Sequence, residues 1–286
     1  MQQAHASDVQ WERISGHRSG EIDFKRLLQG AAGAPDNYEL SVVRTGGDYF
    51  TPRHRHNFDQ VRFCLSGVMN FAPGKDLKAD AVGYFPEGTF YGPQAMTQPS
   101  EVLLLQHGGA AGYGFMSYQQ LTAGYEALRA KGEFEKGAFS YRDAEGRTHR
   151  KDGYEAVWEH VNGRAVEYPP PRYDEPVTMN PANFKWVAVP GVEGFEVKHL
   201  GTFGERDLRV GFVRASRGAK YVSRDLTSPE LIYVIDGTLK LSGKALGAQS
   251  AARLDASDNG GTIEAVEASE VFFVRLPAFA APPRAN

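Results

Sequence analysis

The sequence has a single cysteine, Cys64, among 286 residues, so no disulfide can form within the chain. It also lacks a long apolar run, because "EVLLLQ" and "EVFFVRL" are far shorter than a segment that crosses a bilayer. The opening "MQQAHASDVQWERISG" has charged and polar residues where a signal peptide needs an apolar core. These absences predict a soluble protein of the reducing cytoplasm that does not enter a membrane.

The sequence also has no excess of basic residues over acidic ones. The formal net charge is -3, and 23% of the residues are charged. Proteins that hold nucleic acid or anionic membrane usually carry a strong basic field, which this composition does not supply. Small molecules are therefore the expected partners.

Most of the chain consists of short runs of β-branched and aromatic residues separated by Gly, Pro, Asn and Asp. Examples are "YELSVVRTGG", "QVRFCLSGVMNF", "LRVGFVRASRG", "ELIYVIDGTLKLSG" and "EVFFVRLP". Runs of this length between turn residues are typical of antiparallel strands. The fold class is therefore expected to be all-β.

Two helices are predicted in the middle of the chain. Apolar residues follow helical spacing in "SYQQLTAGYEALRAKGEF" and again in "DGYEAVWEHVNG". Asp152 and Glu155 form a candidate capping box for the second helix, and Gly163 is placed to end it. The segment "EYPPPRYDEPVTMNP" that follows is too rich in proline to continue a helix and is expected to be an extended linker.

An internal repeat sets the organisation of the chain. The stretch that starts "VVRTGGDYF" can be laid over the one that starts "FVRASRGAKY" with one residue deleted in the second copy. Gln60 then falls on Glu230, Gly67 falls on Gly237, and "SEVLLLQ" matches "SEVFFVR". Order and spacing are kept across three elements, which predicts two all-β units of similar design.

The first copy resembles the cupin superfamily. The glycine pair before "DYFTPRHRHNFDQ", the residues His54, His56 and Gln60, and Gly67 correspond to the first cupin motif, and "GYFPEGTFY" corresponds to the second. Together with the repeat, the resemblance implies a bicupin, that is, two double-stranded β-helix (jelly-roll) barrels joined by a partly helical segment. The expected parts are an N-terminal extension (1–37), a first barrel (38–115), a helical insert with linker (116–185), a second barrel without metal ligands (186–279) and a tail (280–286).

The resemblance implies that the first barrel binds a divalent metal ion through His54, His56 and Gln60. The chain departs from the family at two positions, because Gln60 stands where glutamate is usual and Tyr91 stands where a third histidine is usual. Two imidazoles with oxygen donors suit Fe(II), Mn, Ni, Cu or Zn. The family resemblance favours Fe(II) among them.

Strand geometry adds Arg62 to the expected site. Side chains two residues apart point to the same face of a strand, so Arg62 faces the barrel interior if Gln60 does. A neutral glutamine leaves a bound metal its full charge, which favours an anionic ligand, and an inward guanidinium would bind the same anion. Tyr91 is expected to act beside Arg62 as a catalytic proton donor or oxyanion partner.

Other interpretations of these residues stay open. The histidines can be ordinary polar residues, Tyr91 can simply pack its ring, and Gln60 can hold a metal-bound water. Asp59 replaces Gln60 if the register slips by one residue. Cys64 is expected to be a small buried residue, and His107 is expected to end a strand rather than approach the site.

The leading functional hypothesis is a metal-dependent enzyme, an Fe(II) dioxygenase by family analogy, that acts on a small anionic or enolisable substrate. The alternatives are a non-catalytic cupin that binds a small metabolite and a metal-free isomerase or epimerase. The second copy has "YVSRDLTSPE" where histidines would stand, so it is expected to play a structural or dimerising role.

Overall fold

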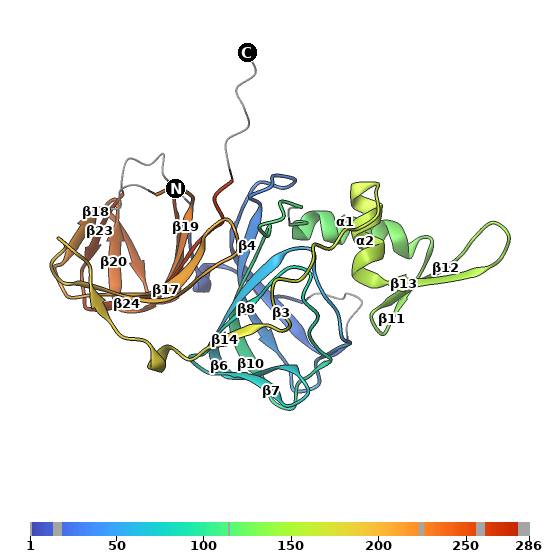
Figure 1. Cartoon of the computed structure of the whole chain (residues 1–286), viewed down its shortest axis with the longest axis horizontal. Helices are drawn as coiled ribbons and strands as arrows, with labels where there is room; N and C mark the ends of the chain where they lie inside the picture. The colour runs from blue at the N-terminus through green and yellow to red at the C-terminus, as the bar shows by residue number, and fades with distance from the viewer. Residues whose placement is uncertain (1, 14–18, 114, 223–225, 256–260, 280–286) are drawn as a thin grey trace, which may run out of the picture. The chain divides into compact units, whose positions relative to one another are not determined.

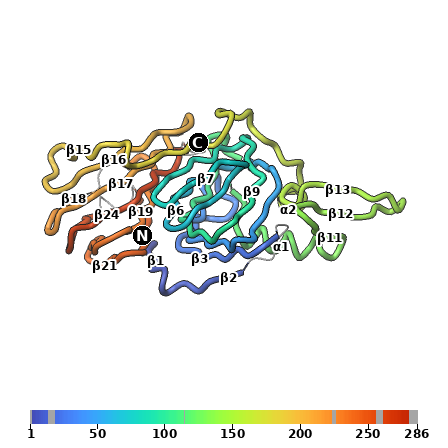
Figure 2. The backbone as a smooth tube through the Cα atoms, turned by 90° about the horizontal axis from the view of Figure 1, so that it is seen from below, coloured from blue at the N-terminus to red at the C-terminus, as the bar shows by residue number. Residues whose placement is uncertain are grey.

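The structure is a computed structural model that describes residues 2–13, 19–113, 115–222, 226–255 and 261–279. The chain divides into two units, which we call the first-barrel unit (Trp11–Met179) and the second-barrel unit (Met1–Gln10 with Asn180–Asn286). Figure 1 shows β-strands in both units, and Figure 2 traces the backbone through the same strands. The predicted tail, 280–286, lies outside the described residues. No helix among the described residues is long and apolar enough to cross a membrane.

The first-barrel unit is built on an eight-stranded sheet. In spatial order its strands are Val177–Met179 (β14), Val82–Phe85 (β8), Asp59–Ala72 (β6), Ser100–His107 (β10), Tyr38–Thr45 (β4), Ile22–Gln29 (β3) and Glu12–Arg13 (β2), with Lys75–Lys78 (β7) paired to β6 off this path. Two short strands, Phe50–Thr51 (β5) and Gln94–Ala95 (β9), pair with each other.

The second-barrel unit is built on a seven-stranded sheet and a four-stranded sheet. The first has the order Gln3–His5 (β1), Ser250–Leu254 (β22), Glu230–Asp236 (β19), Ser269–Arg275 (β24), Leu208–Ala215 (β17), Phe195–Phe203 (β16) and Val187–Ala188 (β15). The second has the order Lys220–Val222 (β18), Thr262–Ala265 (β23), Thr238–Leu241 (β20) and Lys244–Gly247 (β21).

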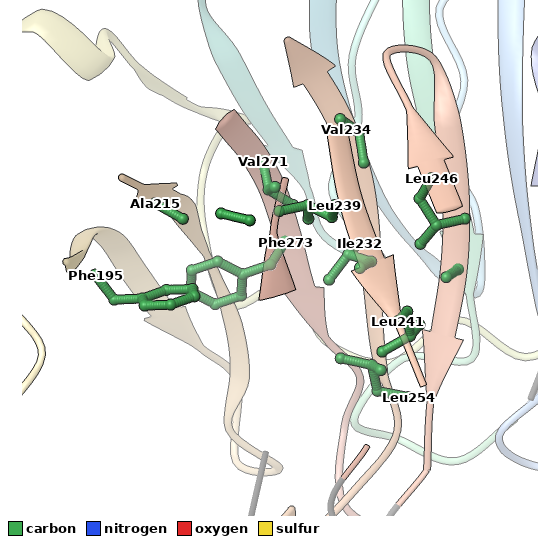
Figure 3. Packing of buried hydrophobic residues seen from close by; sticks show 12 residues of the cluster. Phe195, Ala215, Ile232, Val234, Leu239, Leu241, Leu246, Leu254, Val271 and Phe273 are labelled. Atoms are coloured by element: carbon green, nitrogen blue, oxygen red, sulfur yellow. The ribbon is translucent and has the colours of Figure 1, made fainter. Parts of the chain in front are cut away.

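The two units repeat one strand order, which confirms the all-β, two-barrel prediction. The series β8-β6-β10-β4-β3 in the first unit corresponds to β22-β19-β24-β17-β16 in the second, and neighbouring strands in both series are antiparallel. Successive side chains along each strand point to opposite faces of the sheet. One face of each sheet is therefore turned into the barrel. Apolar side chains of the second barrel gather on that face (Figure 3).

Two glycines confirm the alignment of the copies. Gly67 in β6 has φ +74°, and Gly237 between β19 and β20 has φ +81°. A Cβ on Gly67 would lie 2.4 Å from the Pro99 carbonyl oxygen, and one on Gly237 would lie 2.2 Å from that of Ala268. Both positions therefore need glycine, because the backbone is in the left-handed region and because the neighbouring chain approaches too closely for a Cβ atom.

The insert between the barrels carries the two predicted helices, Tyr118–Arg129 (α1) and Gly153–Asn162 (α2), which pack against each other in the first-barrel unit (Figure 1). Asp152 caps α2 by accepting from two backbone N–H groups, and Gly163 ends it with φ 67°. The reciprocal capping box is found at α1, between Ser117 and Gln120. A three-stranded sheet, Gly132–Glu135 (β11), Ala138–Arg142 (β12) and Thr148–Asp152 (β13), separates the helices in sequence.

The segments expected to be an extension and a linker both contribute strands. Within residues 1–37, β3 pairs with β4 in the first-barrel unit and β1 pairs with β22 in the second-barrel unit. The proline-rich segment is extended, but it packs on the first barrel, where Arg172 donates to the buried Glu87 carboxylate at 2.8 Å. It then ends in β14, which pairs with β8. Burial and the neighbouring Asp59 raise the pKa of Glu87 to about 7.

We expect Gly67→Ala to destabilise the protein more than Gly74→Ala. Gly74 also has a positive φ, +70°, but no atom lies within 4 Å of the added Cβ. Gly74→Ala should cost about 1 kcal/mol for the left-handed backbone alone, whereas Gly67→Ala should cost about 2–4 kcal/mol because the strand must also move. Urea denaturation followed by fluorescence measures both, and equal losses in the two variants would contradict the role assigned to Gly67.

Candidate functional site

Strand β6 places Gln60 and Arg62 inside the first barrel, as the sequence predicts. Their side chains are buried, and both line an interior cavity of about 80 Å³. The cavity wall is completed mainly by Met69, Met96, Gln94 and Gln106 with apolar residues of β3, β4 and β10. A buried guanidinium in a small cavity is a strong local source of positive potential.

The Arg62 guanidinium is held by neutral groups around it. It donates from Nε and from a terminal nitrogen to the Gln60 amide oxygen, and from the same terminal nitrogen to the Tyr91 hydroxyl at 2.9 Å. Its carbon centre lies 4.0 Å from the centroid of the Phe85 ring, a cation–π contact. Gln60, Arg62 and Tyr91 therefore form one polar group inside the barrel.

Tyr91 connects this group to the two histidines. The backbones of His54 and Tyr91 exchange two hydrogen bonds, of 2.9 and 3.0 Å, and the centroids of their rings are 4.4 Å apart. The His56 ring lies edge-on to that of His54 at 5.0 Å. All five residues predicted for the site, His54, His56, Gln60, Arg62 and Tyr91, are thus brought together.

A backbone hydrogen bond fixes the tautomer of His54. Its Nδ1 lies 2.7 Å from the Pro52 carbonyl oxygen, which can only accept, so Nδ1 carries the proton. In the neutral ring the lone pair is then on Nε2. This is the arrangement in which a histidine binds a metal or accepts a proton.

The helical insert reaches the site through Tyr154 of α2. The Tyr154 ring packs edge-on against His56 with 5.3 Å between centroids, and its hydroxyl donates to Asn57 at 2.7 Å. Phe58 covers the same imidazole at 4.5 Å. Nothing in the sequence indicates this contact, because Tyr154 lies far along the chain in a segment that the repeat does not include.

The register excludes Asp59 as a substitute for Gln60. Asp59 lies on the opposite face of β6, where its carboxylate accepts from the Tyr84 hydroxyl at 3.0 Å and from the Glu87 backbone at 2.7 Å. His107 pairs with Asp59 across the strands, is fully buried, and has its pKa lowered to about 4 by burial. Burial raises the pKa of the Cys64 thiol to about 11, so Cys64 is an inert buried residue.

Sequence analysis did not single out Glu39 of β4 and Arg26 of β3, a buried polar pair that lies beyond the cavity lining. Glu39 lies in the same cross-strand row as Gln106 and Gln60. Its carboxylate is 3.5 Å from the buried Arg26 guanidinium, and burial raises its pKa despite that partner. Tyr118 of α1 covers the guanidinium at 3.3 Å from the ring centroid.

The side chains fit a divalent metal only in part. His54 and His56 lie side by side, and His54 has the tautomer of a ligand. The Gln60 oxygen instead accepts from Arg62, and a cation placed on that oxygen would face the buried guanidinium charge. In the described part of the chain, no group of three or more His, Cys, Asp and Glu side chains is arranged to hold a metal ion. The chain thus offers a metal two imidazoles, and this arrangement disfavours Gln60 as a third ligand.

Comparisons with known proteins agree on the fold. No family model and no curated protein sequence matches the chain. Among solved structures, a candidate dioxygenase of Nostoc punctiforme is 12% identical, with a TM-score of 0.62 over 98% of this chain and 87% of that one. A candidate glyoxylate-induced protein of Pseudomonas aeruginosa is 11% identical, with a TM-score of 0.60 over 96% and 87%.

The oxalate decarboxylase of Bacillus subtilis, described with Mn(II) centres, is also similar. It is 14% identical, with a TM-score of 0.55 over 98% of this chain and 78% of that one. At these identities the likeness shows the fold, and it agrees with the cupin motifs and with the repeated strand order. The chain therefore has the bicupin fold, two cupin barrels of one design in a single polypeptide.

Proposed function

We propose that the first barrel is the active site of a metal-dependent enzyme whose substrate is a small carboxylate. The observation that carries this proposal is the buried Arg62 guanidinium, which lines the interior cavity and is linked through Tyr91 to the paired imidazoles. A guanidinium presents parallel N–H donors that match the two oxygens of a carboxylate.

The cavity beside Arg62, whose lining includes neither Tyr91 nor the two histidines, limits the size of a substrate that Arg62 holds. At about 80 Å³ it holds a molecule of a few non-hydrogen atoms, far below the roughly 300–1,000 Å³ of drug-sized ligand sites. Oxalate and glyoxylate, named in the descriptions of the structural neighbours, are of this size and are anionic. We therefore place the substrate among small carboxylates of that kind.

Each side chain has a role that follows from its contacts. His54 and His56 would hold the metal, which when bound supplies a Lewis acid with open coordination positions. Gln60 orients Arg62 by accepting from it, and Arg62 binds and orients the carboxylate. The Tyr91 hydroxyl, 2.9 Å from Arg62, would donate a proton to a substrate oxygen held by that guanidinium. Phe58 and Tyr154 exclude water from the His56 side.

The finer proposal is an Fe(II) dioxygenase, in keeping with the description of the Nostoc punctiforme neighbour. A dioxygenase places both atoms of O₂ in its products, whereas a decarboxylase releases CO₂ from a carboxylate. Oxygen uptake with ¹⁸O₂ and CO₂ release, measured with the same panel of small carboxylates and with Fe(II) or Mn(II), separate the two reactions.

The second candidate is a carboxylate-binding cupin without a metal. It is favoured by the Gln60–Arg62 contact, which puts a fixed positive charge where the usual cupin carboxylate ligand would stand. In that case His54, with its lone pair on Nε2, would accept a hydrogen bond from the ligand. Metal content decides between the two candidates.

We expect His54→Ala combined with His56→Ala to abolish bound metal. Protein purified without added metal should contain close to one divalent ion per chain, and the double variant should contain none, because the imidazoles are the ligands. Elemental analysis by mass spectrometry measures both. His149→Ala, an exposed histidine paired with Asp143 in the insert, is the control and should keep the metal. Full retention in the double variant would place the metal elsewhere.

We expect Gln60→Glu to weaken carboxylate binding. The new carboxylate would form an ion pair with Arg62 and neutralise the charge that binds the substrate. Loss of one charge-assisted hydrogen bond, about 1.5–3 kcal/mol, corresponds to an affinity roughly 10- to 100-fold lower for oxalate by calorimetry. Gln94→Glu, in the same cavity but with its amide bonded to the Asn70 carbonyl, tests whether any added charge has this effect. Unchanged oxalate affinity in Gln60→Glu would remove Arg62 from the binding site.

A further inference from the structure

The second barrel encloses a cavity of about 400 Å³, much larger than that of the first. The functional hypotheses drawn from the sequence leave this barrel without a ligand. Its cavity has two distinct regions, an apolar chamber in the body of the barrel and a polar row of side chains at one end of the sheet.

Strand register builds the polar row. Thr202 of β16 pairs with Arg209 of β17, Arg209 pairs with Arg275 of β24, and Arg275 pairs with Glu230 of β19. All four side chains line the cavity. Four adjacent strands therefore present their polar residues at the same level of the barrel.

This row has an excess of positive charge. Arg275 donates from Nε to the Glu230 carboxylate at 3.0 Å, and a second nitrogen lies 2.9 Å from the same oxygen. The Arg209 side chain makes no hydrogen bond or ion pair with any residue in the described part of the chain. Burial and the Arg209 charge lower the pKa of His199, whose Nε2 contacts the Thr202 hydroxyl, which favours the neutral imidazole. Even with Glu230 ionised, one positive charge remains, on Arg209.

The chamber behind the row is lined by apolar side chains. The next residues along the strands toward the barrel body are Phe273, Val271, Val213 and Ile232, and Leu239 and Ile263 of the facing sheet close the other side. Phe195, Phe273, Val271 and Ile232 belong to one packed cluster (Figure 3). A cavity of this kind favours an apolar body and rejects a second charged group.

We propose that the second barrel binds an amphipathic monocarboxylic acid, with its carboxylate on Arg209 and its apolar chain or ring in the chamber. The volume suits roughly ten to fifteen non-hydrogen atoms, at the low end of the ligand pockets of proteins. The site differs in chemistry from that of the first barrel, since it has no histidine pair and a far larger apolar volume.

The test is calorimetric titration of the full-length protein with octanoate and with 3-phenylpropanoate, each beside the alcohol of the same skeleton. We expect one molecule of acid to bind per chain and each alcohol to bind at least about tenfold more weakly, because it lacks the charge that Arg209 recognises. If neither acid binds, or if acid and alcohol bind equally, the proposal is wrong.

Arg209→Gln identifies the anchor. It should lower the affinity for both acids about 10- to 100-fold and leave the alcohols unchanged. Arg209 is exposed at the cavity mouth, so the variant should fold. The matched control is Arg214→Gln on the same strand, because Arg214 points to the other face and pairs with Glu196. An unchanged acid affinity in Arg209→Gln, or an equal loss in Arg214→Gln, would overturn the assignment.

Two further variants locate the apolar chain. Val213→Phe fills the chamber and should abolish binding of acids and alcohols alike, with an unfolding midpoint near that of the wild type confirming a folded barrel. Gln60→Glu, which neutralises the carboxylate-binding Arg62 of the first barrel, should bind the acids as the wild type does. Loss of acid binding in Gln60→Glu would place the ligand in the first barrel and contradict the proposal.

Discussion

The pairing register between β6 and β10 decides the chemistry of the first barrel. Gln60 opposite Gln106 and Arg62 opposite Leu104 point inward, whereas Asp59 opposite His107 points outward. A slip of one residue would exchange the two sets, so that the Asp59 carboxylate would lie where the Gln60 amide now lies and an apolar side chain would replace Arg62. The left-handed conformation at Gly67, on which the Pro99 carbonyl closes, helps to hold this register at the other end of the strand pair.

The same scaffold carries different charges in the two units. The inward row Glu39, Gln106 and Gln60 of the first barrel corresponds in register to Arg209, Arg275 and Glu230 of the second. In the first barrel Tyr118 of α1 covers Arg26 beside Glu39, and the interior cavity has a volume of only about 80 Å³. The second barrel keeps a chamber of about 400 Å³. The two copies therefore share their strand pairing, whereas the side chains of each copy determine the charge of its polar row and the volume of its cavity.

Much of the site was predictable because it depends on local spacing. The repeat identified the strands that pair at the centre of both sheets, and alternation along β6 put Gln60 and Arg62 on one face. Tyr91 was expected beside them from the second cupin motif. The hydrogen bonds from Arg62 to the Gln60 oxygen were not expected. Two inward side chains of one strand can contact a ligand or contact each other, and the side-chain rotamers determine which contact forms.

Contacts made across long sequence separations escaped prediction. Tyr154 contacts His56 from helix α2. The apolar spacing of that helix indicates that one face is buried but does not indicate which residues that face contacts. Strands β1, β3 and β14 lie toward the sheet edges and outside the best-matching part of the repeat. Their sequences are short or alternate only weakly between apolar and polar residues, so they fit a connecting segment as well as a strand. They become part of a barrel by pairing with a strand that is distant in the sequence.

The position of β1 has a consequence for how the chain folds during synthesis. Residues Gln3–His5 are synthesised before the strands of the first-barrel unit, whereas their pairing partners, Ser250–Ala252, are synthesised after those strands. The strands of the first-barrel unit all lie between these two points in the sequence and can fold in the meantime. Strand β1 therefore cannot pair with β22 while the first-barrel unit is being synthesised, and the second barrel can complete its sheet only after β22 has been made.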